Sequence, residues 1–478
     1  MAPRDLARSL VAPSVVILVA DGARPDTLEA AMDAGHLPSL ARLRAEGGLY
    51  SVSSVFPSVT GPAYTPFLMG RHPGLVGLPG IRWYDRARER THWPAYSRSY
   101  VGLGMHELDG DLDASSPTLF ELASSRLGAL SVIERGLTRR DKVARGVGFV
   151  ASAGLTHFRG DVSGWLDIDR RVADQVVERI ADECPQFVFC ALTGIDKASH
   201  SAGHDAPVVR DAMRIVDSTA ARIRADAERD GRWDQMHLWI VSDHGHAPVH
   251  THEDLAALLC KNGVRVRAHP WTIGVGQRAA VMVSGNAMAH IYLDLNARAR
   301  PWWPALALEW EWLSELLLCR ESTDLVLLPL SATECEVRSK SKGIARVTTD
   351  RGLYSYRTLT GDPFRLGELT ALDATAAHDA TAAGDYPDAL VQVALLAGSA
   401  RAGDIILSAA RGWDFRAKWE PIPHVSAHGA LHREHMLVPL LVNRPAVERP
   451  RRTVDVFASA LSALGIGTGA RCEGVSWR

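Results

Sequence analysis

Residues that could bind metal ions or act as a nucleophile follow several apolar runs of this chain. They are Asp21, Thr60, Asp196, His200, Asp243 and His244, and a late His428 could complete the set. Mixed aspartate and histidine ligands suit zinc first and manganese or iron next, whereas an all-oxygen set would suit magnesium or calcium. A threonine hydroxyl bridged to a divalent ion becomes a nucleophile without a neighbouring base, and a second ion can hold the opposite oxygen of an in-line displacement. These residue types therefore indicate a two-metal hydrolytic site.

Two pairs of these residues have spacings that allow both side chains to reach one cation. Asp196 and His200 are four residues apart, which one helical turn or a tight loop can accommodate. Asp243 and His244 are adjacent and would point to opposite faces inside a strand. At a strand end, where Gly245 permits an abrupt turn, both side chains can converge on a metal.

Ordinary structural roles remain alternatives for these residues. Asp21 could be a helix N-cap, and Thr60 could be a hydrogen-bonded turn residue. Several neighbours are rivals for the same roles: Ser58 for Thr60, His204 for His200, and His424, His432 and His435 for His428. The histidines that follow His244 closely are expected to be solvated loop residues; they are His246, His250 and His252.

Short apolar runs alternate with amphipathic helical patterns over most of the chain. Strands are expected at Val15–Val19, Leu130–Ile133, Phe187–Leu192, Leu238–Val241, Asp404–Ser408 and Met436–Val442. Helices are expected over Leu37–Glu46 and around an apolar face that runs from Val209 to Ile223 at spacings of three and four. Apolar strands alternating with helices predict an α/β fold, with a mostly parallel central sheet and helices on both faces. Ligands gather beyond the carboxyl ends of such strands, where Asp21, Asp196 and Asp243 fall.

The alternation stops between residues 255 and 400. This stretch holds tryptophans between Trp302 and Trp312, and an Ala/Thr/Asp-rich segment, Leu372–Gly384, that we expect to be a loop or linker. We interpret residues 255–400 as an inserted cap subdomain, and residues 13–254 and 401–478 as the two parts of a catalytic core. The tryptophans are expected to pack inside the cap, with a substrate clamp as the alternative.

Composition and charge limit the expected partners and location. The 53 Lys and Arg residues nearly balance the 55 Asp and Glu residues, so bulk electrostatics predict no nucleic-acid binding. No run approaches the roughly 18 apolar residues of a membrane-spanning helix. The six cysteines form no C-x-x-C pair, and Pro13 interrupts an N-terminal stretch that makes a poor signal peptide. The cytoplasm is therefore the expected location, and the sequence does not indicate an oligomeric state.

Taken together and in this order, the motifs resemble the alkaline phosphatase superfamily, in particular its nucleotide pyrophosphatase/phosphodiesterase branch. The matching segments are Val16–Gly22, Phe56–Pro62, Met69–Gly74, Trp83–Asp85, Asp196–His200, Ser242–Gly245 and His428–Gly429. The resemblance covers residues 13–250 and 400–478. It implies an alkaline-phosphatase-like fold and a metal-dependent hydrolase of phosphoric esters or anhydrides.

The resemblance also implies a role for each residue of the set. Thr60 would be the catalytic nucleophile that accepts the phosphoryl group as a covalent phosphothreonine. Asp21, Asp243 and His244, together with Thr60, would bind the ion that activates this hydroxyl. Asp196, His200 and His428 would bind a second ion, which activates the water that hydrolyses the intermediate. Two divalent ions are therefore expected, with zinc first and manganese or iron as alternatives.

One position departs from the family pattern. An asparagine that helps to bind a phosphoryl oxygen commonly follows the nucleophile by three residues, but this chain has Ala63. Loss of such a donor can cost roughly 2.7–4 kcal/mol in the transition state. Tyr64, Thr65 or a backbone N–H could replace it, or the substrate could differ from a nucleotide diester.

The substrate is accordingly expected to be a small phosphate ester or phosphonate. Candidate substrate-binding residues are Tyr64, Trp83 and Tyr84, with core packing as the alternative for Trp83 and Tyr84. A phosphonate hydrolase or phosphomonoesterase on the same scaffold is the alternative activity, and a catalytically silent metal-binding homologue is a third possibility.

Overall fold

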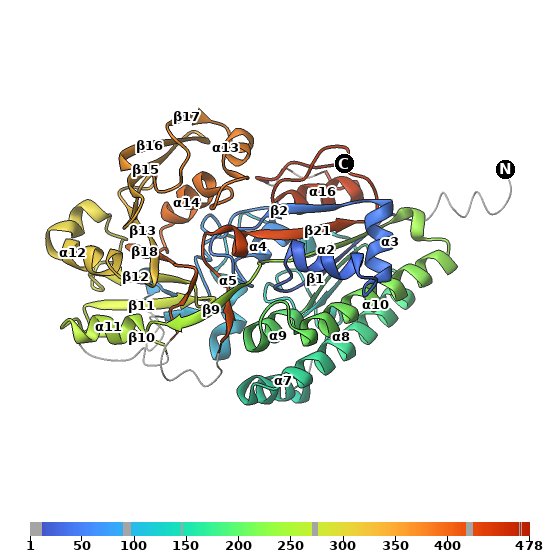
Figure 1. The fold of residues 1–478 in the computed structure, drawn as a ribbon. Coiled ribbons are helices and arrows are strands. Elements are labelled where there is room, and N and C mark those ends of the chain that lie inside the picture. Colours follow the sequence, from blue (N-terminus) through green and yellow to red (C-terminus); the bar gives the residue numbers. More distant parts are fainter. Residues whose placement is uncertain are drawn as a thin grey trace.

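The chain forms two large β-sheets that occupy opposite halves of the molecule in Figure 1. The computed structural model describes residues 12–88, 97–144, 147–269, 276–416, 424–467, 469 and 471–478. One sheet has seven strands and the other has nine. None of the helices in these ranges is both long and apolar enough to cross a membrane.

The seven-stranded sheet brings the carboxyl ends of its central strands together. Its order is β2 (Leu49–Ser53), β21 (Leu437–Val442), β8 (Met236–Val241), β1 (Ser14–Ala20), β7 (Phe187–Leu192), β5 (Arg126–Ala129) and β6 (Lys142–Val143). The pairs from β8 to β6 are parallel, whereas β21 is antiparallel to both of its neighbours. In the register of β1, Ala20 lies opposite Leu192 and Val19 lies opposite Val241. Residues that directly follow β1, β7 and β8 therefore meet at one edge of the sheet.

Helices cover both faces of this sheet, as the sequence predicted. Val15, Ile17 and Val19 of β1 belong to one core, and the alternating residues Val16 and Leu18 belong to another. The first core includes α4 (Tyr64–Met69), α6 (Leu119–Leu122) and α16 (Asp455–Leu464). The second includes α2 (Pro25–Asp33), α3 (Pro38–Glu46), α8 (Val162–Glu183), α9 (Gly194–Ala202) and α10 (Pro207–Arg229). Because both faces are buried, the central strands β1 and β7 are almost entirely apolar, and the α/β prediction is confirmed.

The nine-stranded sheet is almost entirely antiparallel. Its order is β10 (Val266–Ala268), β11 (Ala279–Ser284), β12 (Met288–Leu293), β18 (Ile405–Ala409), β13 (Thr323–Pro329), β14 (Glu334–Ser339), β15 (Gly343–Asp350), β16 (Leu353–Gly361) and β17 (Leu369–Leu372). One face packs on α11 (Leu255–Lys261) and α12 (Trp303–Leu318), and the other packs on α13 (Ala374–Thr381) and α14 (Ala389–Ala397). Trp303 and Trp310 are buried in the first of these cores, as expected, whereas Trp312 is partly exposed.

Three local expectations differ from the structure. Leu372–Gly384 is not a loop: it ends β17 and forms α13, whose first turn is capped by the Asp373 side chain accepting a hydrogen bond from the Ala376 amide. Alanines favour a helix once such a cap is present. The strand expected at Leu130–Ile133 lies four residues earlier, as β5 (Arg126–Ala129), because these residues are the ones that pair with β7. The expected strand near residue 405 exists as β18, but it pairs with β12 and β13 of the second sheet.

Candidate metal centre and active site

Three buried carboxylates meet at the carboxyl edge of the seven-stranded sheet. Asp21 follows β1 directly, Asp243 follows β8, and Asp196 lies in the first turn of α9 behind β7. Their exposed fractions are 2%, 0% and 2%, respectively. Asp21 Oδ1 and Asp243 Oδ2 accept no hydrogen bond from the described residues. Such closely spaced buried carboxylates need a cation as a partner.

Burial and mutual repulsion separate the acidities of these carboxyl groups. Burial raises the pKa of Asp21 well above its ordinary value, and the charges of Asp243 and Asp196 raise it further. Burial also acts to raise the pKa of Asp196, but the Lys197 ammonium and the His200 ring outweigh it and hold that pKa well below its usual range. Lys197 Nζ lies 2.8 Å from Asp196 Oδ2, so the opposite oxygen, Oδ1, is the one that faces the histidines.

The predicted histidine ligands have their tautomers fixed by backbone carbonyls. Nδ1 lies 2.8 Å from the Ser426 carbonyl in His200, 2.9 Å from the Ser58 carbonyl in His428, and 3.2 Å from the Gly245 carbonyl in His244. A carbonyl oxygen only accepts, so Nδ1 carries the hydrogen in each ring, and in the neutral ring Nε2 presents a lone pair. This arrangement is typical of metal-binding histidines.

The lone pairs of these rings face carboxylate oxygens. His200 Nε2 and His428 Nε2 lie 3.2 Å and 3.6 Å from Asp196 Oδ1. His244 Nε2 lies 3.3 Å from Asp21 Oδ1 and 3.6 Å from Asp243 Oδ2. Two donors bound to one zinc ion at tetrahedral angles, with bonds of about 2.0–2.1 Å, would lie about 3.3 Å apart. Lone pairs opposed at these distances repel unless a cation lies between them, so the residues present fit two metal ions.

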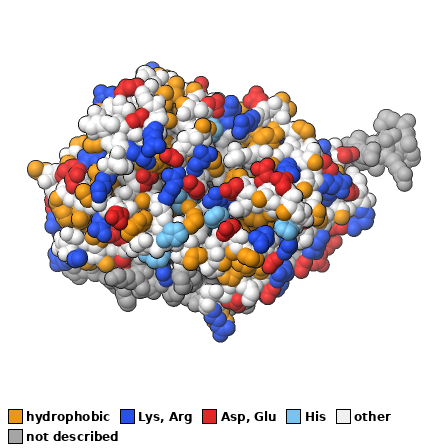
Figure 2. Space-filling model, viewed as in Figure 1, with side chains coloured by type: hydrophobic (Ala, Val, Ile, Leu, Met, Phe, Trp, Pro, Cys, Tyr) orange, Lys and Arg blue, Asp and Glu red, His pale blue; other side chains and the backbone are white. Residues whose placement is uncertain are grey.

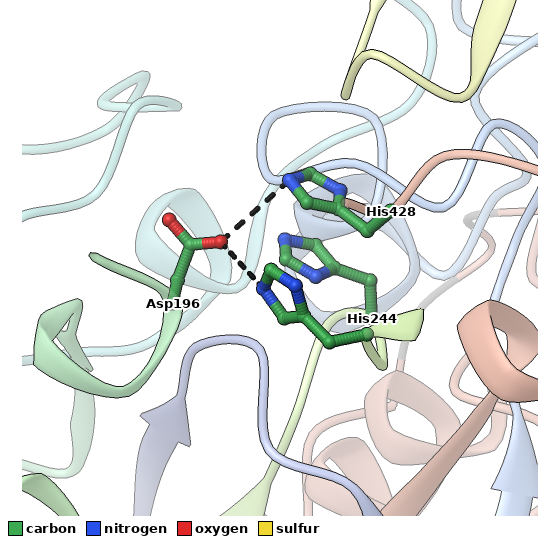
Figure 3. A group of neighbouring side chains, drawn as sticks. Asp196, His244 and His428 are labelled. Atoms are coloured by element: carbon green, nitrogen blue, oxygen red, sulfur yellow. Dashed lines mark hydrogen bonds and ion pairs between the residues drawn. The ribbon is translucent and has the colours of Figure 1, made fainter. Parts of the chain in front are cut away.

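The donor atoms divide into two groups that overlap at His244. One group is Asp21, Asp243 and His244, and the other is Asp196, His244, His246 and His428. Figure 3 shows the rings of His244 and His428 projecting toward the Asp196 carboxylate. Figure 2 shows several histidine side chains reaching the surface in the middle of one face of the molecule.

Thr60 places the predicted hydroxyl at this cluster. It lies in the turn before α4, is only partly buried, and has its Oγ1 3.4 Å from His244 Nε2. The rival Ser58 is fully buried, and its hydroxyl donates to the Ala430 carbonyl instead.

The rival histidines have other partners. The His424 ring packs 4.4 Å from the His200 ring, and its Nδ1 contacts the Asn286 amide. His432 and His435 pack against each other with ring centroids 4.0 Å apart. His204 lies beyond the end of α9 and belongs to neither donor group. The predicted ligand His200 also lies outside both groups, but its Nε2 is 3.2 Å from Asp196 Oδ1.

The second sheet holds His428 in place. The β11–β12 hairpin turns at Gly285 and Asn286, and this tip pairs with the backbone of His428. The His428 amide donates to the Gly285 carbonyl at 3.2 Å, and the Ala287 amide donates to the His428 carbonyl at 3.0 Å. The candidate ligand His428 therefore depends on the nine-stranded sheet for its position.

The three candidate substrate-binding residues are buried. Trp83 and Tyr84 lie in the hydrophobic core, with exposed fractions of 0% and 1%, and the Tyr84 hydroxyl donates to the Leu295 carbonyl. The structure therefore favours core packing, the alternative left open for both. Tyr64 is also fully buried; burial raises the pKa of its hydroxyl, and the charges of Asp21 and Asp243 add to this rise.

Two residues at the centre were not anticipated from the sequence. His246 is completely buried, with its Nε2 2.9 Å from Asp196 Oδ1, so the expectation that it is a solvated loop residue is wrong. Tyr100 follows β4 (Ser97–Ser99), and its hydroxyl accepts a hydrogen bond from the Gly61 amide at 3.1 Å, next to Thr60. The closeness of His246 to the Asp243-His244 pair was the available hint, whereas no motif marks Tyr100.

Comparison with known proteins gives one sequence family and a shared fold. Residues 15–305 match the profile of the type I phosphodiesterase / nucleotide pyrophosphatase family. A search among curated proteins finds no match.

Solved structures resemble both sheets together. Phosphonoacetate hydrolase from Sinorhizobium meliloti, in complex with phosphonoformate, has a TM-score of 0.58 at 16% identity, over 95% of this chain and 96% of that one. An inactive threonine-to-alanine variant of murine ectonucleotide pyrophosphatase/phosphodiesterase 5, in complex with AMP, has a TM-score of 0.56 at 14% identity over 98% of each chain. The human protein of the same name has a TM-score of 0.56 at 15% identity over 97% of each chain. At these identities the likeness concerns the fold.

Proposed function

Since this chain belongs to the type I phosphodiesterase / nucleotide pyrophosphatase family and is a phosphoric ester hydrolase, we propose that it acts through a covalent phosphothreonine at Thr60 and two divalent metal ions. The observation that carries this proposal is the position of the Thr60 hydroxyl, 3.4 Å from His244 Nε2, which itself lies 3.3 Å from Asp21 Oδ1 and 3.6 Å from Asp243 Oδ2. Murine ectonucleotide pyrophosphatase/phosphodiesterase 5, which shares the fold, is inactive as a threonine-to-alanine variant, and this adds support.

The residues fit two ions with different donors. Asp21, Asp243 and His244, with Thr60, would hold one ion, and Asp196, His200 and His428 would hold the other. The mixed oxygen and nitrogen donors favour zinc, with manganese or iron as alternatives. When bound, the ions would lower the pKa of the Thr60 hydroxyl and stabilise negative charge on the phosphoryl oxygens.

The chain's own groups then define the reaction. Thr60 Oγ1 gives its proton to solvent and forms a bond to phosphorus while the bond to the leaving oxygen breaks, and that oxygen leaves as an alcohol after it takes a proton from water. Water hydrolyses the phosphothreonine in the second step and regenerates the hydroxyl. Burial acts to lower the pKa of Lys197, but the charges of Asp196 and Asp21 outweigh it and raise that pKa above its ordinary value. Lys197 therefore stays charged and offsets part of the negative charge of the cluster.

Ala63 stands where the family commonly has an asparagine that donates to a phosphoryl oxygen. We propose that the Tyr100 hydroxyl supplies this hydrogen bond instead. Its oxygen accepts the Gly61 amide hydrogen, so its own hydrogen is available for a phosphoryl oxygen held at Thr60. Burial raises the pKa of Tyr100 well above its ordinary value, with Asp243 and Asp21 adding to the rise, and this keeps the hydroxyl protonated.

A direct test is hydrolysis of bis-p-nitrophenyl phosphate by the zinc- or manganese-loaded protein. Thr60→Ala should abolish turnover, whereas Ser58→Ala should retain it because the Ser58 hydroxyl is committed to the Ala430 carbonyl. Acid-quenched wild-type protein should carry a phosphoryl group on Thr60 in peptide mass spectrometry. Normal turnover by the Thr60→Ala protein would rule out this mechanism.

A second candidate activity is phosphonate or phosphomonoester hydrolysis at the same centre. Ala63 motivates it, and so does the shared fold with a phosphonoacetate hydrolase that binds phosphonoformate. Initial rates on matched mono-, di- and phosphonate esters separate these activities, because the preferred class gives the highest kcat/KM.

A further inference from the structure

His246 lies inside the group of donors around Asp196. Its Nε2 is 2.9 Å from Asp196 Oδ1, closer than His200 at 3.2 Å and His428 at 3.6 Å. Its side chain is completely buried. Three imidazoles therefore point at the same carboxylate oxygen.

The tautomer of His246 is fixed by a serine. Nδ1 lies 3.1 Å from Ser426 Oγ, and Ser426 Oγ donates its own hydrogen to the Ala247 carbonyl at 3.0 Å. A hydroxyl has one hydrogen, so toward His246 it can only accept. Nδ1 therefore carries the hydrogen, and in the neutral ring the Nε2 lone pair faces Asp196 Oδ1 at 2.9 Å.

The His246 ring is also held in position by its surroundings. Strand β9 (Ala247–His252), which follows it, pairs with β20 (Ser426–Ala427), so that Ala247 lies opposite Ala427. Arg24 Nη1 donates to the His246 carbonyl at 2.7 Å. A Cβ at Gly22 would lie 3.0 Å from His246 Cδ2 and Nε2, so the residue after Asp21 leaves just enough room for this ring.

We propose that His246 is a fourth protein ligand of the ion bound by Asp196, His200 and His428. This inference rests on the metal centre of the proposed function. A cation between Nε2 and Oδ1 would be attracted to both atoms, so their lone pairs would no longer repel each other. One ion can do this for His200, His246 and His428 together, because all three face the same oxygen.

The extra imidazole makes the two ions unequal. The proposed ligands of this ion, here called the Asp196 group, are Asp196, His200, His246 and His428, which offer three nitrogens and one carboxylate. The other ion is offered two carboxylates, one nitrogen and a hydroxyl, from Asp21, Asp243, His244 and Thr60. Nitrogen donors favour zinc over manganese, so a single equivalent of zinc should fill the Asp196 group first. Zinc held there by four protein donors can take up a substrate or water oxygen only by becoming five-coordinate.

The experiment counts the imidazoles on one isolated ion. Asp21→Ala removes a carboxylate from the other group, and this variant is loaded with one equivalent of zinc. X-ray absorption at the zinc edge should then show three imidazole ligands. The added change His246→Ala should leave two, whereas His250→Ala, an exposed histidine on β9, should leave three.

Zinc affinity measured against a chelator gives a second readout. Loss of an outer partner of a ligand typically costs about 10–100-fold in affinity, so His246→Ala should cost more than about 100-fold. Two imidazoles with His246 intact, or a smaller loss of affinity, would overturn the proposal and make His246 a positioning residue for Asp196. Wild-type protein that binds no zinc would overturn the metal centre as well. The count on protein with His246 intact does not depend on whether the His246→Ala variant folds.

Discussion

The imidazole rings of His244 and His428 lie almost parallel, with their centroids 3.5 Å apart and their planes 3° from each other. His244 follows β8 of the first sheet and faces Asp21 and Asp243, whereas His428 follows β20 and faces Asp196. The stack therefore joins the two donor groups, and displacement of one ring disturbs the other.

Removal of metal ions should destabilise the protein. Three buried carboxylates then lie close together with Lys197 as their nearby cation and no metal ion, and an ion present at 100 times its Kd contributes about 2.7 kcal/mol to stability. A chelator should therefore lower the melting temperature in calorimetry, and zinc should restore it. Asp21→Asn, which removes one buried charge, should shrink the difference. Equal melting temperatures with and without chelator would contradict the proposed metal centre.

Gly285→Ala should weaken metal binding without unfolding the chain. Gly285 has φ of +59°, and a Cβ there would lie 2.4 Å from Val59 Cγ1 and 2.8 Å from His428 Nδ1. Gly352→Ala is the matched control, because φ is +81° and nothing lies within 4 Å of its Cβ. Both variants pay a backbone cost of roughly 1–2 kcal/mol. Only Gly285→Ala should lower zinc affinity and kcat. Equal effects of the two changes would show that the hairpin tip does not position His428.

Tyr100→Phe should lower catalysis while it spares metal content. The change removes the hydroxyl beside Thr60 and leaves the buried ring in place. Loss of one donor to charge that develops in the transition state costs about 10²–10³-fold in kcat. Steady-state rates on a phosphodiester, with zinc measured in parallel, check this. An unchanged kcat would leave the donor role to another group.

His290→Gln should flatten the dependence of stability on pH. Nε2 of His290 donates to the Pro79 carbonyl, Nδ1 accepts from the Gly403 amide, and burial lowers the pKa of this ring from 6.5 to about 4. Between these values the unfolded chain binds the extra proton, so the free energy of unfolding rises with pH across this window and falls as pH drops through about 4. The shift corresponds to on the order of 3 kcal/mol at full titration.

Urea unfolding of the wild-type and His290→Gln proteins between pH 4 and 7 measures this difference. The wild-type protein should gain more stability over the range than the variant does. Parallel curves for the two proteins would show that His290 is protonated as readily in the folded chain as in the unfolded one.

The carboxylates of the centre could be placed from the sequence because parallel strands bring their carboxyl ends to one edge. Asp21 and Asp243 follow apolar runs directly, so the strand assignment was sufficient for both. Thr60 and His428 were candidates from residue type alone, with nearby rivals, since their positions depend on turns and on contacts with distant segments; the family resemblance gave them their roles.

His246 and Tyr100 show where sequence reasoning ended. The direction of the His246 ring is set by pairing of β9 with β20, which lies far along the chain. Tyr100 reaches Gly61 because β4 pairs with β3 (Arg82–Tyr84), and no motif in the sequence indicated this pairing. The place of β18 in the second sheet likewise depends on partners that no local periodicity specifies.

The bond from His428 to the Ser58 carbonyl joins residues 370 positions apart, so the centre is completed late in synthesis. When β1, β7 and β8 have emerged from the ribosome, Asp21, Asp196 and Asp243 follow closely behind them, but His428 has not yet been synthesised. The nascent chain therefore carries an acidic, unfinished edge until the β11–β12 hairpin and His428 have both emerged and docked. Hydrolysis can begin only after His428 has docked, and the appearance of activity during translation would report the moment at which the two sheets join.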